Sequence, residues 1–295
     1  AFPELVVYVL GICANLPLNI ALVFGIGSHP GLGFDGAPIA TFCMRSINCV
    51  ALVSIALRLH RRGVIRLPSP SREAWAAHRL CTFCEQMIPQ VLMALLQELG
   101  FAAVAFLANE LSEEALAAHT SMMQSFIWLT SPLFGVITAT EVRIGNHLGA
   151  GDAKAARMVA LLCLGICVSL CLCVATVLTL ARNEIGRFFT EDPNVISLVA
   201  DIAPIAAVSY IGLGVFFAAM ATLAGQGRPL PAALGFLFGA FALSPSLGAF
   251  LAFVAKCCGR TQLIGLWLGL CGGYAVTVLI TGAAALCSDW EALAK

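Results

Sequence analysis

The residue in this chain best placed to do chemistry is an acid inside an apolar run. Glu98 is the only ionisable side chain between Glu85 and Glu110. As a helix, this run is long enough to cross a bilayer, and it places the carboxylate roughly 18 Å from either flanking acid. A charge near the middle of a membrane is costly, and such acids usually face a cavity where they bind ions or substrates. The sequence therefore predicts a functional role for Glu98, in an ion or substrate pathway.

Glutamines accompany this acid on the same predicted helix. Gln86, Gln90 and Gln97 recur at helical spacing, so their side chains share one face. Glu98 follows Gln97 and lies about 100° further round the helix, on the flank of this polar stripe. Gln90, Gln97 and Glu98 are therefore candidate cavity residues. The alternative is a structural acid that is satisfied by an interhelical hydrogen bond or by Arg45.

Composition excludes several other classes of protein. Hydrophobic residues make up 60% of the chain and charged residues only 11%, whereas soluble domains carry about 25% charged residues. The 16 basic and 16 acidic residues cancel, so no basic surface for nucleic acid is predicted. Cys163, Cys167 and Cys171 recur every four residues without polar neighbours, which favours core packing over a metal site. We expect no enzyme activity, no metal and no organic cofactor.

The apolar runs predict an all-α integral membrane protein, a polytopic bundle of about eight spans. The expected spans are residues 3–26, 36–59, 82–107, 118–140, 157–181, 195–222, 231–254 and 262–287. The connection between the second and third spans is rich in arginine, so it is predicted to lie in the cytoplasm. Alternation from there places both termini on the same side.

A glycine-rich segment joins the fourth and fifth predicted spans. It reads Glu141-Val142-Arg143-Ile144-Gly145-Asn146-His147-Leu148-Gly149-Ala150-Gly151-Asp152 and continues to Arg157. A phosphate-binding loop is excluded, because no strand precedes the segment and the Gly-Lys-Ser/Thr ending is absent. The residues themselves predict a tight turn, with Asp152 capping the next helix and Arg143 and Arg157 at the membrane surface.

This segment resembles the hallmark loop of the multidrug and toxic compound extrusion (MATE) family, in which Arg143, Gly145, Asn146, Gly149 and Gly151 match motif positions. Ala117-Ala118-His119, Gly225-Gln226-Gly227-Arg228 and Gly265-Leu266-Trp267-Leu268-Gly269 match further motifs in the right order. Family members have twelve helices in two six-helix lobes, and this chain resembles helices five to twelve. The resemblance implies these parts: residues 1–60, the last helix pair of the amino-terminal lobe; 61–80, a cytoplasmic linker; 81–288, a complete carboxy-terminal lobe; 289–295, a cytoplasmic tail.

The resemblance implies an antiporter that exports organic, often cationic, compounds in exchange for H⁺ or Na⁺ by alternating access. Its partners would be small organic substrates and the lipid bilayer, and it would be a monomer or require the four preceding helices. The family's acid on helix seven corresponds to Gln97 here, one residue before Glu98. A second family acid corresponds to Leu213 and the family's turn arginine to Ala224. Asn19 and Thr41 match polar residues of a proton-linked site in the amino-terminal lobe.

Aromatic side chains extend the expected cavity. Phe101, Phe106, Phe126 and Trp128 are candidates for walls that bind organic cations, with lipid-facing packing as the alternative use. Two other functions remain open. One is a truncated, transport-inactive membrane subunit, and the other is a lipid or oligosaccharide-lipid flippase of the same superfamily, for which a more cationic cavity is expected.

Overall fold

The computed structural model describes residues 2–26, 29–65, 75–255 and 262–294. These residues form two compact units, residues 1–76 and residues 77–295. The division falls inside the predicted linker, of which residues 66–74 lie outside the described part. Each unit is described by itself.

Eight helices among the described residues are long and apolar enough to cross a membrane. This confirms the predicted multi-pass all-α fold. The helical elements are α1 (Phe2–Phe24), α2 (Gly36–Arg61), α3 (Ala77–Asn109), α4 (Glu113–Gly149), α5 (Ala153–Leu180), α6 (Arg182–Phe189), α7 (Pro193–Gly225), α8 (Leu230–Gly235), η3 (Phe236–Leu243), α9 (Ser244–Ala249), η4 (Phe250–Val254), α10 (Gln262–Leu286) and α11 (Trp290–Leu293).

The first unit is a helical hairpin. Helices α1 and α2 pack on each other and are joined through a two-residue antiparallel ladder, β1 (Gly25–Ile26) with β2 (His29–Pro30), and a 3-10 turn, η1 (Gly33–Asp35). The α1 residue Asn19 donates from Nδ2 to Asn15 O at 2.9 Å, and on α2 Thr41 Oγ1 donates to Ala37 O at 3.1 Å. Both predicted site residues are thus hydrogen-bonded within their own helices.

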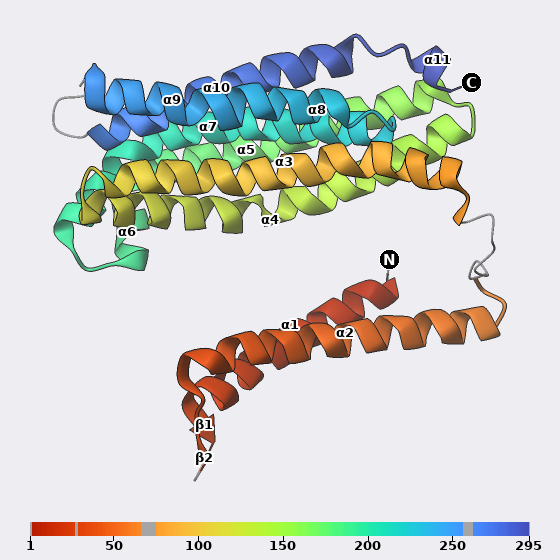
Figure 1. The fold of residues 1–295 in the computed structure, drawn as a ribbon, viewed down its shortest axis with the longest axis horizontal. Coiled ribbons are helices and arrows are strands. Elements are labelled where there is room, and N and C mark those ends of the chain that lie inside the picture. Colours follow the sequence, from red (N-terminus) through yellow and green to blue (C-terminus); the bar gives the residue numbers. More distant parts are fainter. Residues whose placement is uncertain (1, 27–28, 66–74, 256–261, 295) are drawn as a thin grey trace. The chain divides into compact units, whose positions relative to one another are not determined.

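The second unit is a bundle in which α7 is the central element (Figure 1). Helix α7 packs against α4, α5, α6 and α10, and it is the most buried of the predicted spans. The cysteines of α5 lie in this core: Cys163, Cys167 and Cys171 are buried against it, and the Sγ atoms of Cys163 and Cys167 are 3.9 Å apart. Helix α7 is mostly apolar because most of its surface is buried against neighbouring helices.

The seventh predicted span is not a uniform α-helix. Its middle and end, η3 and η4, are wound as π-helix, with α9 between them. Helix α10 packs closely along this span, because a Cβ at Gly273 would collide with Ser244 Oγ and Gly239 O. A different face of α10, with Trp267 and Tyr274, is directed toward the interior of the bundle.

The glycine-rich segment corrects one expectation about the fourth span. We predicted a span ending near residue 140 and a turn after it, but α4 continues as a helix to Gly149. Only residues 150–152 form the turn, where Gly151 has φ +77° and Asp152 Oδ1 accepts from Ala155 N at 2.9 Å. A positive φ is accessible to glycine at little cost, so Gly151 is the residue that the reversal requires.

The chain's last helix covers this turn. Helix α11 packs against α5, and its Trp290 and Leu293 pack against a small buried cluster formed by Ile144, Leu148 and Ala156. Asp289 caps α11 through a hydrogen bond from Ala292 N of 3.1 Å. Ile144 and Leu148 of the glycine-rich segment thus lie in a packed apolar cluster at this end of the unit.

Candidate functional site

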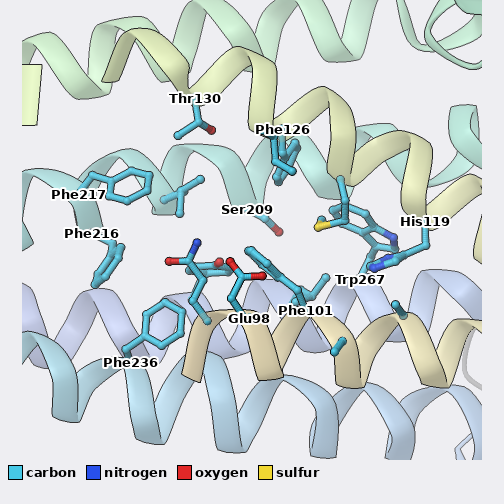
Figure 2. A pocket seen from close by; sticks show the side chains of 18 of the residues that line it. Glu98, Phe101, His119, Phe126, Thr130, Ser209, Phe216, Phe217, Phe236 and Trp267 are labelled. Atoms are coloured by element: carbon cyan, nitrogen blue, oxygen red, sulfur yellow. The ribbon is translucent and has the colours of Figure 1, made fainter. Parts of the chain in front are cut away.

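A cavity of about 610 Å³ opens inside the second unit, between α3, α4, α7, η3 and α10 (Figure 2). Small-molecule sites in proteins have volumes of about 300–1,000 Å³, so the cavity is large enough for an organic compound. It is lined by Gln97, Glu98, Phe101, Ala102, Ala105, His119, Thr120, Met123, Phe126, Ile127, Thr130, Phe134, Ser209, Leu213, Phe216, Phe217, Phe236, Trp267, Leu270 and Tyr274.

Helix α3 contributes the charged group of this cavity. Gln97 and Glu98 both line it, although they are about 100° apart on the helix. Figure 2 shows the Glu98 side chain directed from α3 into the space. Glu98 is exposed, and within the described part of residues 77–295 it has no hydrogen-bond or ion-pair partner. The cavity is wide enough for both side chains to line it. Glu98 therefore lines the cavity even though the family's acid corresponds to Gln97, one residue earlier.

Aromatic rings form much of the wall. Phe216 lies 5.6 Å from Phe217 and 5.7 Å from Phe236, and Phe134 lies 5.7 Å from Phe217, measured between ring centroids. Phe126 contacts Trp267 edge-on at 5.6 Å. These are ordinary offset or edge-to-face arrangements, which leave ring faces available to a ligand.

Two of the four aromatic residues predicted from the sequence line the cavity, and two lie elsewhere. Phe101 and Phe126 line the cavity. Trp128 instead packs with Phe188 and Phe189 of α6, at ring separations of 5.8 and 5.7 Å. Phe106 is 63% exposed and lies outside the cavity lining, so it fits the lipid-facing alternative.

Gln90 lies in a different place from Gln97. It lines a small pocket of about 50 Å³ with Glu141 of α4, where Pro89, Met93, Met220, Ala224, Pro229 and Ala232 complete the wall. Gln90 Nε2 also donates to Gln86 O at 3.4 Å. The predicted polar stripe on α3 is therefore divided between two pockets. Leu213, at the position of the family's second acid, lines the large cavity. Ala224, at the position of the family's turn arginine, lines the small pocket.

The family-loop residues take no part in either pocket. Arg143, Gly145, Asn146 and Gly149 are exposed along the last turns of α4, and Gly151 is exposed in the turn that follows. Gly145 faces Gly225 at the end of α7, where a Cβ would lie 3.7 Å from the Gly225 carbonyl oxygen. This segment fixes the ends of α4, α5 and α7 against one another. Among the described residues, no group of three or more His, Cys, Asp or Glu side chains is placed to hold a metal ion.

Several cavity residues were not singled out from the sequence. Phe134, Phe216, Phe217, Phe236 and Tyr274 come from spans whose residues are mostly apolar. A side chain facing lipid and one facing a cavity have the same composition in such spans, so periodicity carries little information. The available signal was the polar residues on the same helices, Thr130 and Ser209, both of which line the cavity.

The fold and this cavity define a multi-pass helical membrane protein with an internal site for a small molecule. Comparison with known proteins supplies the family. A protein-family model described as MatE matches residues 89–250. A probable multidrug resistance protein NorM from Chromobacterium violaceum is 30% identical over 211 residues, which are 69% of this chain and 44% of that protein. Human multidrug and toxin extrusion protein 2 is 26% identical over 299 residues, covering 100% of this chain and 47% of that protein.

Solved structures show the same fold. The chain superposes on the crystal structure of the eukaryotic MATE transporter AtDTX14 with a TM-score of 0.80 and 23% identity, over 98% of this chain and 62% of that one. The chain therefore belongs to the MATE family, whose members are transporters and not enzymes. It spans about half the length of the curated relatives that it matches.

Proposed function

We propose that this chain forms the ligand-binding lobe of a secondary antiporter that exports organic cations in exchange for H⁺ or Na⁺. One observation carries the proposal: among the described residues that line the cavity of about 610 Å³, Glu98 is the only acid, and most of the others are apolar or aromatic. A carboxylate attracts a cation, and aromatic faces add cation–π attraction of about 0.5–2 kcal/mol each. Such a site suits a bulky organic cation.

Exchange follows if the same carboxylate serves both ligands. Glu98 is accessible and has no described partner, so an organic cation, a proton or a sodium ion can neutralise it in turn. Competition for one charge couples the two fluxes when the cavity opens alternately to the two sides. Leu213 leaves the cavity without a second carboxylate at that position, which favours a proton over a hard-ligand sodium site. The protein is expected to act as a monomer, or to require the four helices that precede this segment in family members.

The flippase alternative receives no support from the lining. A lipid phosphate or diphosphate needs basic partners, and neither lysine nor arginine occurs among the described residues that line the cavity. The transport-inactive alternative is an outcome of the experiment that follows.

The test is dye efflux driven by a proton or sodium gradient in everted membrane vesicles, with the cationic dye tetramethylrosamine as probe. Glu98→Gln is expected to abolish gradient-driven efflux while leaving the amount of membrane-inserted protein unchanged. Glu141→Gln is the matched control, because it removes an acid from the neighbouring small pocket. Unchanged gradient-dependent efflux in Glu98→Gln would rule out the coupling role. Absence of efflux in the unmodified chain, with dye binding retained, would favour the inactive-subunit alternative.

A further inference from the structure

The acid at the small pocket has no counter-charge. Glu141 is half-buried, about two turns before the end of α4, and among the described residues it has no hydrogen-bond or ion-pair partner. Arg143 is exposed two residues further on, about 200° round the helix, so it lies on another side of α4. A buried carboxylate is costly unless a proton or a cation compensates its charge. The carboxylate of Glu141 therefore calls for a compensating group from outside the chain.

Close packing fixes the position of this acid. Helices α4 and α7 meet at Glu141, because a Cβ on Gly225 would lie 3.0 Å from the Glu141 carbonyl oxygen and 2.8 Å from Ile144 Cβ. Residues of α3 and α8 supply the rest of the pocket wall. The backbone that carries the carboxylate is thus held at a helix crossing, so a group that enters the pocket meets a positioned acid.

Helix α3 offers a second oxygen to the same pocket. Gln90 lines it, and Gln90 Nε2 donates to Gln86 O at 3.4 Å. A carbonyl oxygen can only accept, so this hydrogen bond identifies the amide nitrogen and leaves Gln90 Oε1 as the other end of the amide. Gln90 is exposed and Glu141 is only half-buried, so both side chains have surface that a small ligand can reach.

The volume and charge of the pocket define this ligand. About 50 Å³ holds an ion with a water, since a water in the liquid occupies about 30 Å³. Carboxylate and amide oxygens are hard ligands, which hard cations prefer. A monovalent ion neutralises one carboxylate, whereas a divalent ion would leave an uncompensated positive charge. Ala224 at the end of α7 and Pro229 at the start of α8 both line the pocket, so the two helix dipoles oppose each other there and the carboxylate sets the local charge.

We propose that Glu141 and Gln90 bind one small monovalent cation, such as Na⁺, which stabilises the junction of α3, α4, α7 and α8. The cation supplies the charge that the half-buried carboxylate lacks, and water completes its coordination. This site is distinct from the cavity that contains Glu98 and goes beyond the proposed function. Its ion takes no part in the exchange, and the pocket is too small for an organic substrate.

The first experiment measures binding of radiolabelled sodium to the purified 295-residue chain in detergent. Glu98→Gln is the background, so that sodium bound in the large cavity does not contribute. This background is expected to retain close to one sodium ion per chain. Adding Glu141→Gln should abolish the binding, and adding Gln90→Leu should weaken it about tenfold, because one neutral oxygen ligand is lost.

Thermal unfolding of the same proteins gives a second readout. In the Glu98→Gln background, replacing choline with sodium at constant ionic strength should raise the unfolding temperature by about 2–4 °C, because sodium binds only the folded chain. Choline is too large for the pocket. In choline the acid is uncompensated, so adding Glu141→Gln should raise the unfolding temperature, and sodium should have no further effect. Adding Glu191→Gln, which removes an exposed acid, is the matched control and should preserve the sodium-dependent rise.

The outcomes separate this site from the proposed function. If the unmodified chain binds no sodium, the site is overturned even if no variant folds. Sodium binding that persists after Glu141→Gln is added to the background also overturns it, because the ion then binds elsewhere. A temperature rise of equal size with and without Glu141 shows a general salt effect and contradicts the proposal. The role of Glu98 fails on a different result, gradient-driven efflux that survives Glu98→Gln.

Discussion

Helix α3 contributes residues to two pockets, and each pocket is lined by one acid. Near the middle of the helix, Glu98 lines the cavity of about 610 Å³, and two to three turns earlier Gln90 lines the pocket of about 50 Å³ that Glu141 enters from α4. The small pocket has room for one or two waters or an ion, since a water in the liquid occupies about 30 Å³, but not for an organic compound. The same residue type therefore has a different use in each pocket, and it is the surrounding volume that decides which acid can meet a substrate.

The largest expected effect separates the two acids directly. Glu98→Gln should weaken binding of tetramethylrosamine about tenfold or more, because it removes the charge that the cation meets. Glu141→Gln should leave the affinity unchanged, because its pocket is too small for the dye. Fluorescence anisotropy on the purified variants measures both. Equal losses in the two variants would show that the pockets act as one site.

A second variant adds a negative charge to the large cavity. Leu213 lines the cavity on α7, so Leu213→Asp places a second carboxylate near Glu98. We expect the dye to bind about five- to tenfold more tightly and Na⁺ to become a stronger competitor, since two carboxylates supply the hard oxygens that Na⁺ prefers. Leu213→Asn is the uncharged control, and an identical result from it would attribute the change to shape or polarity alone.

A smaller effect is expected when the carboxylate moves by one residue. Because Gln97 and Glu98 both line the cavity, the double variant Gln97→Glu/Glu98→Gln should bind the dye within about threefold of the unmodified chain, a difference below about 1 kcal/mol. The single variant Glu98→Gln supplies the reference for a missing charge. If the double variant binds as weakly as that reference, the position of the carboxylate matters as much as its presence.

The smallest expected effect concerns stability in the small pocket. Glu141 is partly buried, and among the described residues it has no hydrogen-bond or ion-pair partner. Glu141→Gln should therefore raise the free energy of unfolding by up to about 1 kcal/mol, because a neutral amide costs less to bury than a charge. Thermal unfolding in detergent measures the shift, and the exposed Glu191→Gln serves as control. A marked loss of stability in Glu141→Gln alone would reveal a stabilising role for this charge.

The sequence predicted the spans well because membrane helices require long apolar runs. It misplaced the end of α4, because the glycines of the loop segment suggested a turn. In the structure Gly145 and Gly149 lie within the helix, and only Gly151 needs a positive φ. Glycine inside a membrane helix is common where another helix approaches, as Gly225 does beside Gly145.

Only part of the site could be predicted from the sequence, and the reason is physical. A lone charge in an apolar run is expensive and therefore informative, so Glu98 was found from its residue type alone. Phe216, Phe217 and Phe236 carry no such signal, because in an apolar span a ring toward lipid and a ring toward a cavity are equally acceptable. His119 entered only as part of a family motif, and its missing hydrogen-bond partner becomes visible only once the fold buries it.

The central claim is that one carboxylate, Glu98, is shared between the organic cation and the coupling ion. Its most direct test is the dissociation constant of tetramethylrosamine measured as a function of pH, and again as sodium replaces potassium at constant ionic strength. In the unmodified chain, lower pH or added sodium should weaken dye binding, because the ion competes for the carboxylate. In Glu98→Gln this dependence should vanish. The same dependence in both proteins would contradict the account.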